Sequence, residues 1–225
     1  MVSRIVSILV VVGLLGLWGA KCGHRPGMLP LATSVDGPSP ARAARVLVML
    51  HGHGGSGSTT DWIIPELRAR GVGADTAIVM VDGPFSASPG RSWGMSAEEQ
   101  DESLRRVSAL IDGYLRENGS LRVVVAGFSR GADAAVRVAA NTPGIAAVGA
   151  LSGCQFEDVP MLAARADVGV LVAHAANDRV CPNRGSLTLV DTLRKVRHPV
   201  EFVEHAADHS IPGPALDALA KLLTR

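Results

Sequence analysis

The chain alternates short, mainly apolar runs with segments in which apolar residues recur every three or four positions. The apolar runs lie at residues 45–50, 76–81, 121–126, 145–151 and 168–174, and a further strand is predicted at residues 200–205, where apolar and polar residues are mixed. Runs of about five to seven such residues between turns are typical of strands buried on both faces of a sheet. Helical spacing is found at residues 61–70, 132–140, 186–196 and 214–223. Strands that alternate with helices predict an α/β fold, with a mostly parallel sheet and helices on both of its faces.

The helix that begins after Ser96 has the clearest signals at both ends. Ser96 and Glu99 form a capping box, in which each side chain can accept from a free backbone N–H of the first turn. Apolar residues then recur on one face as far as Leu115, and Gly119 follows as a stop signal. In the helix at residues 61–70, Pro65 is tolerated only if it lies in the first turn.

The first residues differ from the rest of the chain. Residues 1–4 carry one charge, a positive one, and residues 5–20 form an apolar run. That length suits the core of a signal peptide better than a full membrane span, which needs about 20 residues. Residues 23–41 are rich in proline and glycine, which is typical of a linker. The sequence therefore predicts a signal peptide or N-terminal anchor at 1–22, a linker at 23–41 and one globular domain at 42–225.

Export to the cell envelope, the periplasm or the medium is the expected localisation. Ala20 fits the position before a cleavage site, but Trp18 is bulky where a small residue is expected. A segment that is not cleaved would attach the protein to a membrane through its N-terminus. Cys22 resembles the modified cysteine of a bacterial lipoprotein, but Lys21 stands where that pattern requires a small residue and argues against lipidation.

Composition favours a domain with a full hydrophobic core and gives no sign of a nucleic-acid partner. The 225 residues are 47% hydrophobic and 19% charged, and their formal net charge is +1. Aromatic residues make up 4%, which leaves little for base stacking, and no basic cluster is present to contact phosphates. We therefore expect no nucleic-acid partner, and the oligomeric state is left open.

A sharp turn that carries a serine follows the strand at residues 121–126. The apolar run ends in Gly127-Phe128-Ser129-Arg130-Gly131, and small apolar residues then recur at helical spacing. Glycine two residues before and two residues after Ser129 lets a strained strand-to-helix turn form without a side-chain clash, and such a turn lifts the serine hydroxyl clear of the sheet. Ser129 is therefore the candidate nucleophile, with an ordinary turn serine as the alternative.

Two further polar residues follow the last two predicted strands. Asp178 comes after the last but one, and His209 lies between the final strand and the final helix. Because parallel strands all end at one edge of a sheet, Ser129, Asp178 and His209 can meet there. A histidine can take the serine proton near neutral pH, and a carboxylate on its other nitrogen fixes the tautomer and stabilises the imidazolium. The chain order Ser, Asp, His also fits this kind of turn, and Asp158 and His205 are the nearest substitutes.

The glycine-rich turn at residues 51–57 follows the first predicted strand and admits a second interpretation. Gly52, Gly54 and Gly57 match a dinucleotide-binding pattern. The acidic residue that would bind the ribose is not at the expected distance, however, and no lysine completes a phosphate-binding loop. A nucleotide-binding protein is therefore the weaker interpretation of this turn.

The histidines do not form a metal-binding pattern. His51, His53 and His174 share no ligand spacing on one element. His205 and His209 straddle a strand end and a loop rather than one face of a helix. We therefore expect no metal ion and no cofactor.

Four motifs in this order resemble the α/β-hydrolase superfamily. They are Leu-His-Gly-x-Gly-Gly at 50–55, Gly-Phe-Ser-x-Gly at 127–131, His-x-x-x-Asp-x-Val-x-Pro at 174–182 and His-Ser-Ile at 209–211. Within the superfamily they are most similar to the compact carboxylesterases, phospholipases and acyl-thioesterases related to dienelactone hydrolases. The resemblance implies a three-layer α/β-hydrolase fold from residue 45 to the C-terminus. No long insertion separates the predicted elements, so we expect a minimal lid or none.

The resemblance also implies roles for four residues beside the Ser, Asp and His. The backbone N–H groups of His53 and Arg130 would form an oxyanion hole. Arg91 and Trp93 resemble an element that lines the acyl side of the substrate pocket, although packing and surface pairing would account for these two residues equally well. Dienelactone hydrolases carry cysteine where Ser129 stands, so their own chemistry is not transferred to this chain.

These observations predict a serine hydrolase that cleaves carboxylic esters or thioesters of short to medium acyl chain through an acyl-enzyme intermediate. Its expected partner is a small-molecule ester. Secreted polyester or feruloyl-type esterases share the same core and are the main alternative. A non-catalytic binding protein of the same fold is the third possibility, but such relatives usually lack the nucleophile or the base, and both are present here.

Cys154 and Cys181 follow two successive predicted strands and should lie at the same edge of the sheet. Two such thiols in an exported chain tend to pair, which would pin the loop that carries Asp178. Pairing requires Cα atoms within about 7 Å, which a sequence does not reveal. Both a disulfide and two free cysteines therefore remain open at this stage.

Overall fold

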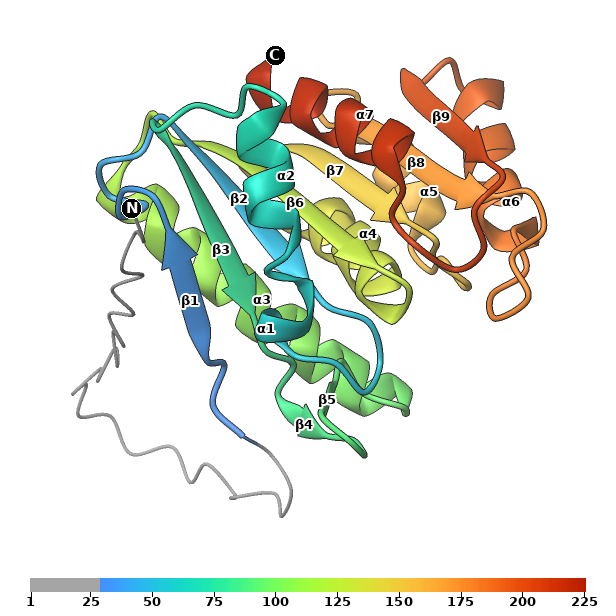
Figure 1. The fold of residues 1–225 in the computed structure, drawn as a ribbon, viewed down its shortest axis with the longest axis horizontal. Coiled ribbons are helices and arrows are strands. Elements are labelled where there is room, and N and C mark those ends of the chain that lie inside the picture. The colour runs from blue at the N-terminus through green and yellow to red at the C-terminus, as the bar shows by residue number, and fades with distance from the viewer. Residues whose placement is uncertain (1–28) are drawn as a thin grey trace.

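A seven-stranded sheet forms the centre of the protein, and helices cover both of its faces (Figure 1). The structure is a computed structural model that describes residues 29–225. The sheet contains β1 (Thr33–Asp36), β2 (Arg45–Leu50), β3 (Thr76–Val81), β6 (Arg122–Phe128), β7 (Ile145–Leu151), β8 (Gly169–Ala175) and β9 (Val200–His205). Their spatial order is β1-β3-β2-β6-β7-β8-β9, in which β1 is antiparallel to β3 and all other pairs are parallel. The predicted α/β fold with a mostly parallel sheet is confirmed.

The helices divide between the two faces of the sheet. They are α1 (Gly57–Thr60), α2 (Ile63–Ala69), α3 (Ala97–Glu117), α4 (Arg130–Asn141), α5 (Val159–Ala163), α6 (Arg184–Lys195) and α7 (Gly213–Thr224). In Figure 1, α2 and α7 lie in front of the sheet, while α3 and α4 lie behind it. One apolar core joins the strands to α3, α4, α5 and α6, and a second joins them to α2 and α7. Because successive residues of a strand point to opposite faces, each central strand contributes to both cores, which explains its unbroken apolar sequence.

The segment predicted to be a linker contains a strand. β1 lies within residues 23–41 and pairs with residues 78–81 at the edge of β3. The Arg68 guanidinium from α2 donates to the Asp36 carboxylate at 3.0 Å and fastens the end of the strand. All four residues of β1 are half-exposed or exposed and show no apolar pattern. The strand forms because the free edge of β3 offers backbone hydrogen bonds. The predicted signal peptide or anchor at 1–22 lies outside the described residues.

Other differences from the prediction are local. The helix predicted at residues 61–70 is the shorter α2, preceded by the single turn α1, and Pro65 lies in the first turn of α2 as expected. A two-stranded hairpin, β4 (Phe85–Ser86) with β5 (Arg91–Ser92), stands between β3 and α3, and no longer insertion interrupts the described domain. Within residues 29–225, no helix combines the length and the apolar character that crossing a membrane requires.

Helix α4 approaches the sheet closely because two glycines face each other at its start. A Cβ on Gly127 would lie 2.0 Å from the carbonyl oxygen of Gly131, and a Cβ on Gly131 would lie 2.2 Å from that of Leu50. Neither distance is compatible with a side chain, so any larger residue must push α4 away from β2 and β6.

We expect Gly131→Ala to lower the free energy of unfolding by about 3 kcal/mol or more, because the added methyl group meets backbone atoms that cannot give way. Urea unfolding of the purified domain measures this. The matched control is Gly113→Ala in α3, where the nearest atom to a Cβ is the end of the Arg116 side chain at 3.8 Å. That change should raise the free energy of unfolding by about 0.5–1 kcal/mol through helix propensity. Equal effects at the two positions would contradict the close-packing argument.

Candidate active site

Ser129 occupies the turn between β6 and α4 with a backbone conformation that residues other than glycine rarely adopt. Its φ is 54° and its ψ is −124°, and the residue is half-buried. Its own N–H donates to the carbonyl of Leu151 at 2.9 Å, which ties the turn to the end of β7. Such a conformation costs about 1–3 kcal/mol and persists where surrounding packing enforces it, here through Gly127 and Gly131. The strained turn expected from the sequence is therefore present at Ser129.

Asp178 and His209 come together at the same edge of the sheet. Asp178 follows β8, His209 follows β9, and the His209 Nδ1 lies 2.7 Å from the Asp178 Oδ2. The Asp178 side chain is fully buried and its Oδ1 accepts from the N–H groups of Val180 (2.9 Å) and Cys181 (2.8 Å). Burial acts to raise the pKa of Asp178, but the hydrogen bonds from Cys181, His209 and Val180 outweigh it and hold this pKa below its ordinary value.

The contact with the Asp178 carboxylate decides the tautomer of His209. Because the carboxylate is ionised and can only accept, the proton of the neutral imidazole lies on Nδ1 and the lone pair on Nε2. The ring of Phe128, the residue before Ser129, packs against that imidazole with centroids 4.8 Å apart and an interplanar angle of 41°. The His209 ring is thus held by Asp178 on one side and by the turn of Ser129 on the other.

The other histidines near this edge have structural contacts. His174 is fully buried, with Nε2 2.8 Å from the Cys181 carbonyl and 3.3 Å from the Asp178 Oδ2. His205 ends β9, and its Nδ1 lies 3.1 Å from the Ala207 carbonyl. Burial lowers the pKa of His205. Of the two histidines that the sequence left open, His209 and not His205 is hydrogen-bonded to Asp178.

The glycine-rich turn after β2 lies against Ser129. A Cβ on Gly52 would lie 3.4 Å from the Cβ of Ser129. His51 is fully buried, and its Nε2 accepts from the Gly83 N–H at 2.9 Å while its Nδ1 lies 2.6 Å from the Gly52 carbonyl. Burial lowers the pKa of His51, which favours the neutral ring. The contacts of this ring with Gly83 and Gly52 hold the turn in place. The N–H groups of His53 and Arg130 take no part in the loop hydrogen bonds of the described residues, although those of the neighbouring Gly54 and Ala132 do.

Arg91 and Trp93 support this turn from the β4–β5 hairpin. Trp93 is 2% exposed, and its indole Nε1–H donates to the His51 carbonyl at 2.7 Å. The backbone of Arg91 exchanges hydrogen bonds with Gly54 and Gly55. Neither residue lines the cleft of about 450 Å³ that opens beside His209. Trp93 does line the small pocket that Arg130 and Asp133 border.

A disulfide joins the loops that follow β7 and β8. Cys154 and Cys181 are bonded, with Cα atoms 5.3 Å apart, so the pairing that the sequence left open is confirmed. Cys181 is the residue whose N–H donates to Asp178 and whose carbonyl faces His174. The disulfide therefore anchors the segment that orients Asp178.

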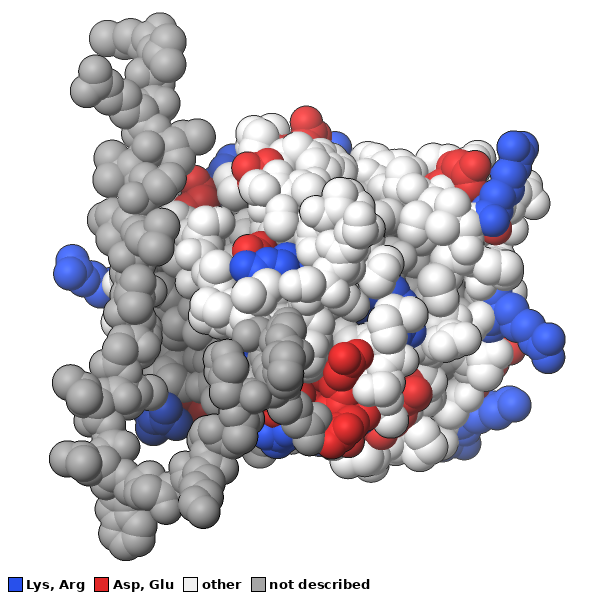
Figure 2. Space-filling model, turned by 90° about the horizontal axis from the view of Figure 1, so that it is seen from below, with Lys and Arg blue, Asp and Glu red and all other residues white. Residues whose placement is uncertain are grey.

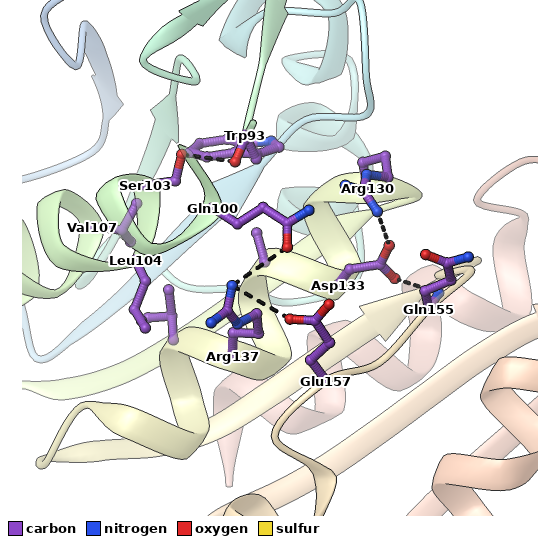
Figure 3. A pocket seen from close by; sticks show the side chains of 12 residues that line it. Trp93, Gln100, Ser103, Leu104, Val107, Arg130, Asp133, Arg137, Gln155 and Glu157 are labelled. Atoms are coloured by element: carbon purple, nitrogen blue, oxygen red, sulfur yellow. Dashed lines mark hydrogen bonds and ion pairs between the residues drawn. The ribbon is translucent and has the colours of Figure 1, made fainter. Parts of the chain in front are cut away.

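Asp133 is a buried acid that the sequence analysis did not single out. It is 6% exposed on α4, and its Oδ1 accepts from the N–H groups of Cys154 (3.0 Å) and Gln155 (3.1 Å). Figure 3 shows this carboxylate between the Arg130 guanidinium, 3.5 Å away, and Gln155, at the wall of a small pocket between α3 and α4. Its only signal in the sequence is an acidic residue among the small apolar residues of the helix. Asp133 connects the helix of Ser129 to the disulfide loop.

Comparison with known proteins places these features in context. Residues 41–218 match the family model described as "Serine hydrolase (FSH1)". Esterase PE8 has a TM-score of 0.74 at 21% sequence identity, over 87% of this chain and 99% of its own. A carboxylesterase from Mesorhizobium loti has a TM-score of 0.72 at 18% identity, over 97% of this chain and 98% of its own. Zea mays acyl-protein thioesterase 2 has a TM-score of 0.67 at 20% identity, over 85% and 97%.

At these identities the likeness to solved structures shows the fold, which is the α/β-hydrolase fold inferred from the four motifs. A search of curated protein sequences finds no match to this chain. Within residues 29–225, no group of three or more His, Cys, Asp or Glu side chains is arranged to hold a metal ion.

Burial raises the pKa of Asp133 from 3.8 to about 6, against the opposing hydrogen bonds from Gln155 and Cys154. The native state therefore holds this proton more tightly than the unfolded chain does. The contribution of Asp133 to stability is present below about pH 4 and is lost as the pH rises through about 6. Asp133→Asn keeps an oxygen acceptor for the two N–H groups but does not titrate.

We therefore expect the wild-type protein to lose stability relative to Asp133→Asn as the pH rises from about 4 to 7. Urea unfolding of both proteins across this range measures the difference, in which the titrations common to both cancel. A difference that is independent of pH, or one that grows in favour of the wild type with rising pH, would contradict the raised pKa.

Proposed function

The chain belongs to the serine hydrolase family denoted FSH1, whose model it matches over residues 41–218, and from this premise we propose that it cleaves carboxylic esters or thioesters of short to medium acyl chain. In this proposal Ser129 is the nucleophile, His209 its base and Asp178 the residue that orients His209. The single observation that carries it is the 2.7 Å hydrogen bond from His209 to a buried, ionised Asp178, beside the strained turn of Ser129.

The proposed reaction begins with transfer of the Ser129 Oγ proton to His209 Nε2 while Oγ attacks the ester carbonyl carbon. The negative charge that develops on the carbonyl oxygen is stabilised by the N–H groups of His53 and Arg130. The contacts of His51 and Trp93 support this step, because they fix the turn that carries the His53 N–H. A preformed oxyanion site needs no rearrangement during the reaction.

Collapse of the tetrahedral intermediate breaks the bond to the leaving group. His209 returns its proton to the departing oxygen or sulfur and leaves the acyl group on Ser129. A water molecule, deprotonated by His209, then attacks the acyl carbon. The bond from that carbon to Ser129 Oγ breaks, Oγ takes the proton back from His209, and the carboxylic acid is released. The short hairpin between β3 and α3 supports action on soluble esters, because it supplies little sequence for a lid.

We further propose that the mature domain works in an oxidising compartment. The disulfide between Cys154 and Cys181 supports this, because disulfides persist outside the reducing cytosol. The apolar segment at residues 5–20 supports export of the chain to such a compartment.

The redox state of the two cysteines in cells tests this localisation. A thiol-reactive maleimide added before lysis should not label Cys154 or Cys181, and both should become reactive after denaturation with a reductant. Peptide mass analysis distinguishes them from Cys22. Full labelling of both residues without reductant would place the folded domain in a reducing compartment.

Substitution of the three proposed catalytic residues tests the reaction. Ser129→Ala should abolish labelling by a fluorophosphonate and lower kcat by at least about a thousandfold, because no other residue can carry the acyl group. His209→Ala should be nearly as damaging. Asp178→Ala should be milder, because an unoriented imidazole still acts part of the time.

His205→Ala is the matched control, since His205 lies close in sequence but is not bonded to Asp178. It should retain most of the activity. If His205→Ala abolished ester hydrolysis while His209→Ala kept near wild-type turnover, the base would be wrongly assigned. A protein that neither reacts with the fluorophosphonate nor cleaves any ester would be a non-catalytic member of the fold.

A further inference from the structure

The two residues next to Ser129 in the sequence line different clefts. Its preceding neighbour Phe128 lines a cleft of about 450 Å³ together with His209, which we call the His209 cleft. Its following neighbour Arg130 lines a cleft of about 500 Å³ together with Glu157, which we call the Arg130 cleft. A substrate whose carbonyl carbon is at Ser129 therefore has one substituent directed to each side.

The two clefts differ in charge. Among the described residues, no Asp, Glu, Lys or Arg lines the His209 cleft, whereas both a guanidinium and a carboxylate line the Arg130 cleft. Figure 2 views the molecule from below and shows charged side chains of both signs in small groups on a mostly uncharged face. Trp62, Phe128 and Ile211 give the His209 cleft its apolar surface.

The direction of proton transfer decides which part of an ester occupies which cleft. When the tetrahedral intermediate collapses, the bond from the carbonyl carbon to the alcohol oxygen breaks, and that oxygen receives the proton held on His209 Nε2. The alcohol oxygen must therefore lie within hydrogen-bond reach of His209. The rest of the alcohol then extends into the His209 cleft, and the acyl group, which stays on Ser129, extends toward the Arg130 cleft.

The exposed side chain of Trp62 is not needed to attach α2 to the core. It stands at the start of α2 and is 45% exposed, while the adjacent Ile63 and Leu67 are fully buried and attach the helix to the core. A large exposed aromatic ring beside an uncharged cleft offers area for an apolar group to cover. A carboxylate in the same cleft would lose hydration and find no oppositely charged side chain among the described residues that line it.

We infer that the His209 cleft is the leaving-group site, and that it selects esters of bulky, uncharged alcohols with an apolar face that packs on Trp62. This inference rests on the proposed function, because it takes Ser129 as nucleophile and His209 as the proton donor to the alcohol. It names the substrate class by the alcohol, which the proposed function leaves open.

The test uses butyrate esters that differ only in the alcohol. The 3-methylbutyl and 2-carboxyethyl esters have nearly the same shape, but only the 2-carboxyethyl ester is charged. We expect kcat/KM for the 3-methylbutyl and benzyl esters to exceed that of the ethyl ester at least tenfold, and the 2-carboxyethyl ester to show no such gain. Equal values for the 2-carboxyethyl ester and its neutral counterpart would overturn the inference.

Variants at Trp62 locate the selectivity. Trp62→Ala should lower the ratio of kcat/KM for benzyl to ethyl butyrate about tenfold, and Trp62→Phe should restore most of it. The matched control is Met161→Ala on α5, which is similarly exposed at 48% but lies outside both clefts, and it should leave the ratio unchanged. If Trp62→Ala instead altered the preference for acyl length among ethyl esters, the acyl group would occupy this cleft and the inference would be wrong.

Failure of the inference and failure of the proposed function give different results. An enzyme that reacts with the fluorophosphonate and cleaves ethyl butyrate, but shows no dependence on the alcohol, overturns the leaving-group site alone. A protein that shows neither reaction overturns both proposals.

Discussion

The close contact between α4 and the sheet is the constraint on which the site depends. Gly127 and Gly131 allow α4 to begin directly over β2 and β6, where no Cβ fits. This approach holds Ser129 at a φ of 54° without a compensating side-chain hydrogen bond at the helix start. The strain is local, but its support comes from Leu50 on a neighbouring strand and from Leu151 on the other. The central position of β6 in the sheet is therefore part of what holds the serine in place.

A chain of contacts connects the turn of Ser129 to the loop of Asp178. Asp133 on α4 accepts from the N–H of Cys154, Cys154 is bonded to Cys181, and the Cys181 N–H donates to Asp178. The first two links join segments that follow different strands, and the third lies within the loop after β8. The relative position of the proposed nucleophile and the proposed base thus depends on one buried carboxylate and one disulfide, in addition to the sheet. Rigid support of this kind keeps reacting groups within the small tolerance that catalysis allows.

The turn that carries His53 is supported from the opposite side. Trp93 donates to the carbonyl of His51, and Gly83 donates to the His51 ring. Both donors come from the segment after β3, so the strand next to β2 helps to fix the turn after β2. Arg91 and Trp93 therefore support the glycine-rich turn after β2, although they line no part of the His209 cleft. Arg91 would act on a substrate through the backbone of the turn, whereas Trp93 also lines the pocket beside Arg130.

The sequence by itself determined the elements that carry a local pattern of apolar residues or a capping signal. The predicted strands at 76–81, 145–151 and 200–205 coincide with β3, β7 and β9, and the capping box at Ser96 marks the start of α3. The turn at Ser129 was also predictable, because its two glycines avoid a clash between residues only four positions apart in the chain.

Only the tertiary structure decided the contacts between loops that follow different strands. It brought His209 rather than His205 to Asp178, paired Cys154 with Cys181, and buried Asp133 beneath the disulfide loop. It also made β1 from a segment with no apolar pattern, because the free edge of β3 supplies the hydrogen bonds. A periodic pattern records how one element is buried, whereas these contacts depend on where parallel strands end relative to one another in space.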